Sequence, residues 1–336
     1  MFRIHQRIAL AVALTIFVLL LAGCAGQTAA PAAAGETAPL TPITLYMGFR
    51  PDVQFAPFYV GIEKGFFAEQ GIALTTQHAS ESDMVRLVGT GEILFAIVSG
   101  EQVLLARAQG VPIVYVYEWY EDYPVAIAAK AGMGINTPAD LAGRSVGVPM
   151  QEGASYIGLE ALLASAGLTD ADINLQVTGF TQVETLATDR VEAVVIYASN
   201  EPVQLEAQGI EAVVIRVADY SDLVSNGMIT SEEVIREQPE LVRAMAAALT
   251  QALEYTAANP DEAFAIAQQY VEGLDDPALA EVQKAVLERS IALWGSGRYG
   301  ETDLAAWQAM QDLLLRMGLL DTPQDLEAAF TNEFLP

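Results

Sequence analysis

The chain has 336 residues, of which 52% are hydrophobic, and its net charge at pH 7 is -27. This length and hydrophobic content predict a globular body with a large core and exclude a disordered protein. The strong negative charge repels nucleic acid and anionic lipid headgroups, so we expect no nucleic-acid partner. A single cysteine excludes a disulfide framework and a cysteine-based metal site, and we expect neither a metal nor a cofactor.

The first 23 residues have the pattern of a secretory signal, in which two arginines precede an apolar run over residues 8–21. The run is short for a stable membrane span. The ending Leu-Ala-Gly-Cys resembles the bacterial lipobox, which implies that Cys24 is lipidated and becomes the first residue of the mature protein. An ordinary signal, or a membrane span with a chance cysteine, is the alternative. Residues 24–42 are rich in Ala, Pro, Thr and Gly and predict a flexible tether to an extracytoplasmic body.

From residue 43 onward, strand and helix patterns alternate in two similar units. In the first unit we expect strands over 43–49, 72–77, 93–98 and 113–117 and helices over 58–67, 83–88 and 103–108. In the second unit we expect strands over 145–148, 174–177, 191–197 and 212–217, helices over 156–166, 182–188 and 202–207, and a capped helical turn over 137–141. Alternation with short connections predicts two α/β lobes, each with a mostly parallel sheet.

The chain becomes helical after residue 231. Helix-spaced apolar residues fill 232–258, 260–270, 277–293, 303–317 and 323–330, and we expect most of these helices to pack back on the first lobe. Residues 123–130 and 226–230 are the candidate crossings between the lobes. We therefore predict a hinged clamp in which lobe 1 comprises 43–125 and 226–336, lobe 2 comprises 126–225, and a ligand binds between them at the carboxyl ends of strands.

Enzyme signatures are mostly absent from this sequence. It contains no Gly-x-Ser-x-Gly elbow, no P-loop and no Gly-x-Gly-x-x-Gly after a strand. His78 is the only histidine after the leader, and a lone histidine is more often structural than catalytic. Paired-carboxylate hydrolysis stays open, but no pair among the 43 acids is singled out. We assign no catalytic residue and favour binding over catalysis.

The first unit offers ligand-binding candidates after its first and fourth strands. Aromatic side chains could stack on a planar ligand there while an amide selects the polarity of its edge. The candidates are Phe49, Arg50, Gln54, Phe55, Trp119 and Tyr120. Phe55 could equally anchor the following helix to the sheet.

The second unit offers polar candidates after its strands, where backbone N–H groups and side chains would face the cleft. They are Ser155, Tyr156, Gln182, Tyr197, Asn200 and Glu201. Asn200 is also a plausible helix N-cap. Glu201 could accept hydrogen bonds from a ligand, or it could be a solvated acid in the first turn of a helix.

Several of these motifs resemble those of periplasmic binding proteins for the thiamine pyrimidine precursor and their relatives. The similar segments are 54–60 with 63–67, 103–110 and 200–205, and the resemblance covers about 44–230. It implies a two-lobed periplasmic-binding-protein fold of type II, each lobe a sheet flanked by helices, with a helical C-terminal extension on the first lobe. It also implies a solute-binding lipoprotein of an ABC importer, which delivers its solute to a permease. We expect this protein to be a monomer.

Two branches of this family compete, one for the aminopyrimidine precursor and one for riboflavin. Segments 123–127, 153–159 and 179–183 resemble the riboflavin branch more closely, and aromatic wealth near the cleft suits a three-ring flavin. The paucity of Lys and Arg in these loops suits an uncharged ligand and argues against sulfonate, phosphate or FMN, with Arg50 as the main exception. We expect riboflavin as a transported ligand, with the pyrimidine precursor or another small solute as alternatives.

The same family includes fungal enzymes that make the pyrimidine. These enzymes are similar in fold and use a cysteine-rich iron motif and a sacrificial histidine. This chain has no cysteine after Cys24 and therefore departs from that pattern.

Overall fold

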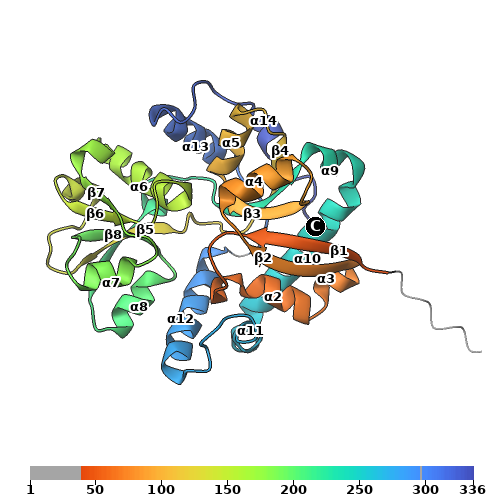
Figure 1. Cartoon of the computed structure of the whole chain (residues 1–336), viewed down its shortest axis with the longest axis horizontal. Coiled ribbons are helices and arrows are strands. Elements are labelled where there is room, and N and C mark those ends of the chain that lie inside the picture. The colour runs from red at the N-terminus through yellow and green to blue at the C-terminus, as the bar shows by residue number, and fades with distance from the viewer. Residues whose placement is uncertain (1–38, 296) are drawn as a thin grey trace, which may run out of the picture. The chain divides into compact units, whose positions relative to one another are not determined.

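Two five-stranded sheets with helices packed around them organise the chain (Figure 1). The computed structural model describes residues 39–295 and 297–336, and Leu40–Pro336 form one compact unit. The predicted signal, the predicted lipidation at Cys24 and most of the predicted tether lie outside the described residues. The two sheets with their helices are the two lobes of the α/β fold that the sequence predicts.

The first sheet has the strand order β2-β1-β3-β10-β4. Its strands are β1 (Thr41–Met47), β2 (Ile72–His78), β3 (Phe95–Ser99), β4 (Ile113–Glu118) and β10 (Asn226–Ser231). β1 pairs in parallel with β2 and β3, whereas β10 is antiparallel to both β3 and β4. Buried side chains fill β3 and most of β4, and those of β3 are apolar as far as Val98, as expected of strands covered on both faces.

The second sheet repeats this design with the order β7-β6-β8-β5-β9. Its strands are β5 (Val125–Lys130), β6 (Ser145–Val148), β7 (Asn174–Val177), β8 (Ala193–Tyr197) and β9 (Ala212–Arg216). β5 is antiparallel to β8 and β9. In each sheet the strand in the fourth place of this order, β10 in the first and β5 in the second, is antiparallel to its neighbours. The chain forms this strand when it arrives from the other lobe. The segments expected as crossings are thus largely strands, β5 and β10.

The helices fall into three groups along the chain. The first lobe contains η1 (Val53–Phe55), α2 (Ala56–Glu63), α3 (Phe66–Glu69), α4 (Glu81–Gly89) and α5 (Glu101–Ala108). The second lobe contains η2 (Pro138–Leu141), α6 (Gly153–Ser165), η3 (Asp170–Asp172), α7 (Gln182–Ala187), α8 (Glu201–Ala207) and η4 (Val217–Asp219). The C-terminal group contains α9 (Glu232–Glu237), α10 (Pro239–Ala258), α11 (Pro260–Ala267), α12 (Pro277–Leu293), α13 (Leu304–Arg316) and α14 (Leu326–Ala329).

Two predicted helices are each divided in the structure. The helix expected over 58–67 becomes α2 and α3, because Gly65 adopts a left-handed φ of 79° that interrupts the helix. The helix expected over 232–258 becomes α9 and α10, because Gln238 precedes Pro239 and leaves the helical region, with φ -137° and ψ 48°. A residue before proline is pushed towards extended backbone.

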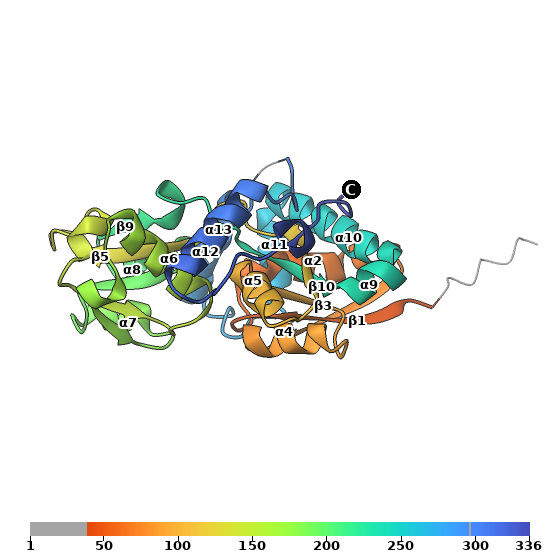
Figure 2. The same cartoon turned by 90° about the horizontal axis from the view of Figure 1, so that it is seen from above.

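The C-terminal helices pack mainly on the first lobe, as the sequence predicts. α10 and α11 lie against α2, α13 lies against α5, and α14 lies against β4. α12 contacts both η1 of the first lobe and α8 of the second, and α5 contacts α6 across the lobes. Figure 2 shows α12 between the two lobes. In the described part of the chain we find no helix with the length and hydrophobicity of a membrane span.

Candidate functional site

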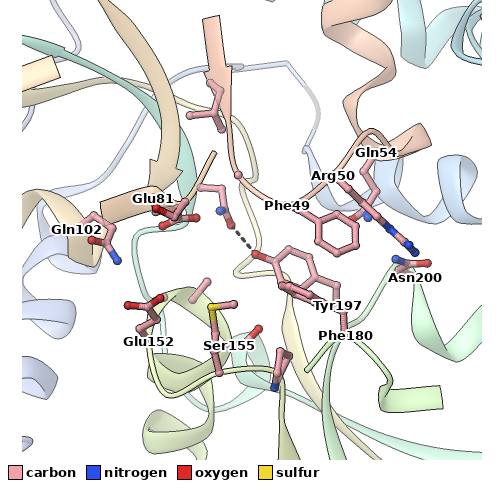
Figure 3. Close-up of a pocket in the computed structure, with 18 of the residues that line it drawn as sticks. Phe49, Arg50, Gln54, Glu81, Gln102, Glu152, Ser155, Phe180, Tyr197 and Asn200 are labelled. Carbon is pink, nitrogen blue, oxygen red and sulfur yellow. Dashed lines mark hydrogen bonds between the residues drawn. The ribbon is translucent and has the colours of Figure 1, made fainter. Parts of the chain in front are cut away.

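A cavity of about 400 Å³ lies between the lobes and is lined by side chains of both (Figure 3). The first lobe contributes the loop between β1 and α2, the start of α4 and the segment after β4. The second lobe contributes the loops between β6 and α6, between β7 and α7, and between β8 and α8. These loops leave the carboxyl ends of their strands, where α/β sheets bind ligands. The volume is in the range of small-molecule sites.

All of the predicted ligand-binding residues except Tyr156 line this cavity. Those present are Phe49, Arg50, Gln54, Phe55, Trp119, Tyr120, Ser155, Gln182, Tyr197, Asn200 and Glu201. The Tyr156 side chain instead interacts with Glu160 on the same helix. Tyr156 is one residue further into the helix than Ser155, and a helical residue points about 100° away from its neighbour. The structure therefore groups the candidates, and their contact with a ligand stays a prediction.

Three first-lobe aromatics form a buried surface that we call the aromatic wall: Phe55, Trp119 and Tyr120. They are 6%, 3% and 1% exposed. The Trp119 ring lies 5.3 Å from Phe55 and 4.7 Å from Tyr120, centroid to centroid. Within the described residues, the buried indole N–H of Trp119 has no hydrogen-bond partner. A flat ligand placed on this wall would find a preformed apolar surface.

Gln54 connects the aromatic wall to the second lobe. Its side-chain carbonyl accepts hydrogen bonds from the hydroxyls of Tyr120 and Ser199, each at 3.3 Å. Its amide donates to Asp52 at 3.0 Å. A second connection runs from the Tyr197 hydroxyl to the Asn226 side-chain oxygen at 3.3 Å. These bonds hold the lobes together around the cavity.

An aromatic pair from the two lobes borders the cavity and is more exposed; we call it the rim pair. Phe49 and Phe180 are 36% and 53% exposed, and their rings meet edge to face with centroids 5.1 Å apart. The Arg50 guanidinium lies over the Phe49 ring at 5.2 Å. Phe49 has a φ of 61°, which is strained for a bulky residue. Strained backbone of this kind persists only where the surrounding structure fixes it, and it clusters at ligand sites.

Glu201 and His78 differ in their relation to the cavity. The Glu201 carboxylate lines it and accepts the Tyr197 backbone N–H at 2.9 Å. Burial raises the pKa of Glu201 to about 7, against the effect of that hydrogen bond. His78 is not among the lining residues; its ring Nδ1 lies 3.0 Å from the Gly48 carbonyl, and burial lowers its pKa.

Sequence reasoning missed several residues of the site. The unpredicted lining residues that carry polar or aromatic groups are Ser80, Glu81, Ser82, Gln102, Glu152, Phe180 and Asn226. Glu152 and Phe180 lie beside predicted candidates, in loops that follow strands. This position in the sequence could have identified them as lining residues. Glu81 and Gln102 begin helices whose loops seemed unremarkable in the sequence. Across residues 39–295 and 297–336, no group of three or more His, Cys, Asp or Glu side chains could hold a metal ion.

Relatives of this chain include binding proteins and enzymes. It is 37% identical to the riboflavin-binding protein RibY of Chloroflexus aurantiacus, over 96% of both chains. It is 26% identical to a formylaminopyrimidine-binding protein of Halalkalibacterium halodurans, over 96% of this chain and 97% of the relative. It is 23% identical to a 4-amino-5-hydroxymethyl-2-methylpyrimidine phosphate synthase of Legionella pneumophila, over 88% of this chain and 92% of the enzyme.

Among solved structures, the fold is similar to that of the periplasmic aliphatic sulphonate binding protein SsuA of Escherichia coli. The TM-score is 0.70 at 16% identity, and the match covers 86% of this chain and 92% of the other. This similarity confirms the predicted periplasmic-binding-protein architecture. The family model described as NMT1/THI5 like matches residues 52–263. With most of the chain matched by that model, and with a relative at 37% identity over nearly its whole length, this protein belongs to the NMT1/THI5-like family.

Proposed function

We propose that this protein is the extracytoplasmic solute-binding component of an ABC importer, which captures riboflavin in the cavity between its lobes and delivers it to a permease. The observation that carries the proposal is the aromatic wall in a chain that is 37% identical, over 96% of its length, to a riboflavin-binding protein. A three-ring flavin is flat and aromatic, so its faces suit a preformed surface of this kind.

Stacking and burial supply most of the affinity in this proposal. Apolar area removed from water contributes about 25 cal/mol per Å², less the entropic cost of association. Gln182, Asn200 and Glu201 line the cavity from the second lobe, and in this proposal they select the polar edge of the ring. A ligand that contacts both lobes stabilises their closed arrangement and shifts the population towards it.

The proposal includes binding without chemistry. The two relatives with the higher identities are named as binding proteins, whereas the synthase is 23% identical. Riboflavin is cargo in this scheme, and no cofactor is needed. We further propose that the protein acts as a monomer held to the membrane by a lipid on Cys24. Mass spectrometry of the membrane-extracted protein should find the acyl mass on that residue, and an unmodified cysteine or an uncleaved leader would refute the anchor.

The second candidate is a pyrimidine-precursor binder, which the 26% identical formylaminopyrimidine-binding relative favours. A single aminopyrimidine ring covers less of the aromatic wall than a flavin does. It would therefore leave more of the 400 Å³ cavity to water.

Titration of the purified protein distinguishes these candidates. Riboflavin should release or absorb heat on mixing, and its fluorescence should be quenched as the ring stacks on Trp119 and Phe55. Formylaminopyrimidine should give no saturable heat. Saturable binding of formylaminopyrimidine without binding of riboflavin would replace the first candidate with the second. Turnover of either compound would refute the binding-only scheme.

A further inference from the structure

Three of the helices that begin at the cavity bring a glutamate to it. Glu81 is the first residue of α4, Glu201 is the first residue of α8, and Glu152 immediately precedes α6. All three line the cavity. A helix N-terminus carries partial positive charge and stabilises an anion. Here the protein supplies negative charge at the positions where an anionic ligand would otherwise be stabilised.

Glu81 is held so that one oxygen is used by the protein and the other is free for a ligand. Its Oε2 accepts the Ser99 backbone N–H at 3.1 Å and the Ser99 hydroxyl at 2.6 Å. Among the described residues, Oε1 makes no hydrogen bond, and Gly48 leaves space beside it, since a Cβ there would lie 3.3 Å from this oxygen. The carboxylate is therefore fixed in orientation and presents an unused acceptor.

The Ser99 hydroxyl lies between two carboxyl groups, 2.6 Å from Glu81 and 2.5 Å from Glu101. A hydroxyl donates one hydrogen bond, so one of the two acids must carry its own proton. Glu101 is fully buried and its Oε2 has no partner among the described residues. Burial, with the neighbouring Glu81 as a lesser cause, raises the pKa of Glu101 to about 8. Glu101 is thus the neutral member, and Glu81 is the acceptor that borders the cavity.

Glu152 faces Glu81 from the second lobe. Figure 3 shows Glu81, Gln102 and Glu152 together on one side of the cavity, with the rim pair and Arg50 on the other. We call this group of three the carboxylate end. The charge of Glu152 contributes to raising the pKa of Glu81, after the larger effect of burial. Among the described lining residues, Arg50 is the one Lys or Arg, and it lies over Phe49 on the opposite side.

We propose that Glu81 and Glu152 form an anion-rejecting subsite, which accepts hydrogen bonds from the hydroxyl groups of an uncharged polyol chain and excludes the phosphate ester of that chain. This inference rests on the proposed function, since it places the flavin ring on the aromatic wall and the ribityl chain at the carboxylate end. Hydroxyl groups donate to carboxylates in charge-assisted bonds. A phosphate in the same place meets the like charge of two carboxylates, which is unfavourable.

The test compares three flavins on the wild-type protein and on two neutral variants. Riboflavin carries the polyol, FMN carries its phosphate ester, and lumiflavin has the ring without the polyol. We expect the wild type to bind riboflavin at least about a hundredfold more tightly than FMN. Glu81→Gln and Glu152→Gln should each lower that ratio by about tenfold. Both should leave the lumiflavin affinity unchanged, because lumiflavin does not reach the carboxylate end.

Two control variants separate the subsite from the overall charge of the protein. Glu69→Gln and Glu184→Gln remove the same charge from exposed positions outside the cavity, one in each lobe, and should leave the ratio at its wild-type value. Glu152 is also exposed, so its variant folds even if Glu81→Gln does not.

The outcomes separate the two claims. If the wild type binds riboflavin but its preference over FMN is the same in Glu81→Gln and Glu152→Gln, the subsite is refuted and the proposed function stands. If the lumiflavin affinity falls together with the riboflavin affinity in these variants, the residues act on the ring and the subsite is again refuted. If the wild type binds neither riboflavin nor lumiflavin, the proposed function fails, and the subsite fails with it.

Discussion

The two lobes share one strand order, yet they present different walls to the cavity. The aromatic wall of the first lobe is buried, with Trp119 at 3% exposure among packed aromatic rings. The second-lobe wall includes Phe180 at 53% and Met150 at 36% exposure. The difference indicates that the aromatic side chains of the first lobe are already packed before a ligand binds. Phe180 and Met150 of the second lobe become packed only when a ligand covers them.

The C-terminal helices explain the difference. α11 and α12 pack against η1, which lies in the loop that carries Phe55, and α12 brings Trp294 to within 6.3 Å of Trp119, centroid to centroid. In the second lobe α12 contacts α8, whereas neither α11 nor α12 packs closely on α6, the helix that follows the corresponding loop, within the described residues. The helical extension thus rigidifies one wall of the cavity and leaves the other adaptable.

The largest expected effect is a loss of stability on truncation of the aromatic wall. Trp119→Ala should lower the free energy of unfolding by about 3 to 5 kcal/mol, because it removes a large side chain from a packed cluster and leaves a void. Urea denaturation followed by circular dichroism measures this loss. The same variant should also lose most of its riboflavin affinity, since the void lies in the stacking surface.

Trp119→Phe is the matched variant for that prediction. It keeps an aromatic ring in the cluster and should recover much of the lost stability. A loss below about 1 kcal/mol for Trp119→Ala would mean that the wall tolerates truncation as an exposed surface does. The contrast between the lobes would then be wrong.

The second prediction concerns two glutamates, one in each lobe, whose pKa values are shifted in opposite directions. In the first lobe, burial raises the pKa of Glu101 to about 8. In the second lobe, hydrogen bonds from the Ser145 backbone and from Arg144 lower the pKa of Glu192. Between about pH 4.5 and pH 8, the folded state keeps the Glu101 proton that the unfolded state has lost. Glu101 therefore makes the folded protein less stable as pH rises through this window.

Glu101→Gln should remove that pH dependence, because glutamine resembles the protonated acid. The difference in unfolding free energy between variant and wild type should shift in favour of the variant from pH 5 to pH 8, by on the order of a few kcal/mol. Denaturant midpoints measured at pH 5, 6, 7 and 8 give the slope. Glu192→Gln is the control, because a lowered pKa changes stability only below pH 5, and its slope should match that of the wild type. Parallel curves for Glu101→Gln and the wild type would contradict the prediction.

The sequence predicted most of the elements because hydrophobic alternation and helix spacing are local signals. It did not reveal that 123–130 and 226–230 mainly form the antiparallel strands β5 and β10, because pairing with a sheet is decided by partners distant in the chain. The division of the long C-terminal pattern at Pro239 was a local signal that the prediction did not use.

The site was predictable in outline because loops after strands collect at one edge of each sheet. The missing members are instructive. Glu81 precedes the helix predicted over 83–88, and its orientation is fixed by Ser99, which lies 18 residues away in the chain. Tyr156 was a reasonable candidate from its loop, but helical geometry turns it away from the cavity. Sequence position identifies the loop, whereas the direction of each side chain depends on where the helix begins.

The smallest expected effect is on the second-lobe side of the cavity, where Phe180 is exposed. Phe180→Ala should leave the unfolding free energy within about 0.5 kcal/mol of the wild type, because the side chain is half exposed. It should weaken riboflavin binding about three- to tenfold through loss of an aromatic contact at the rim, as measured by isothermal titration. Val177→Ala, which truncates a residue that is 61% exposed and outside the cavity, should change neither quantity. Equal losses of stability for Phe180→Ala and Trp119→Ala would show that both walls are equally fixed, and ligand-driven closure of the second lobe onto the first would lose its support.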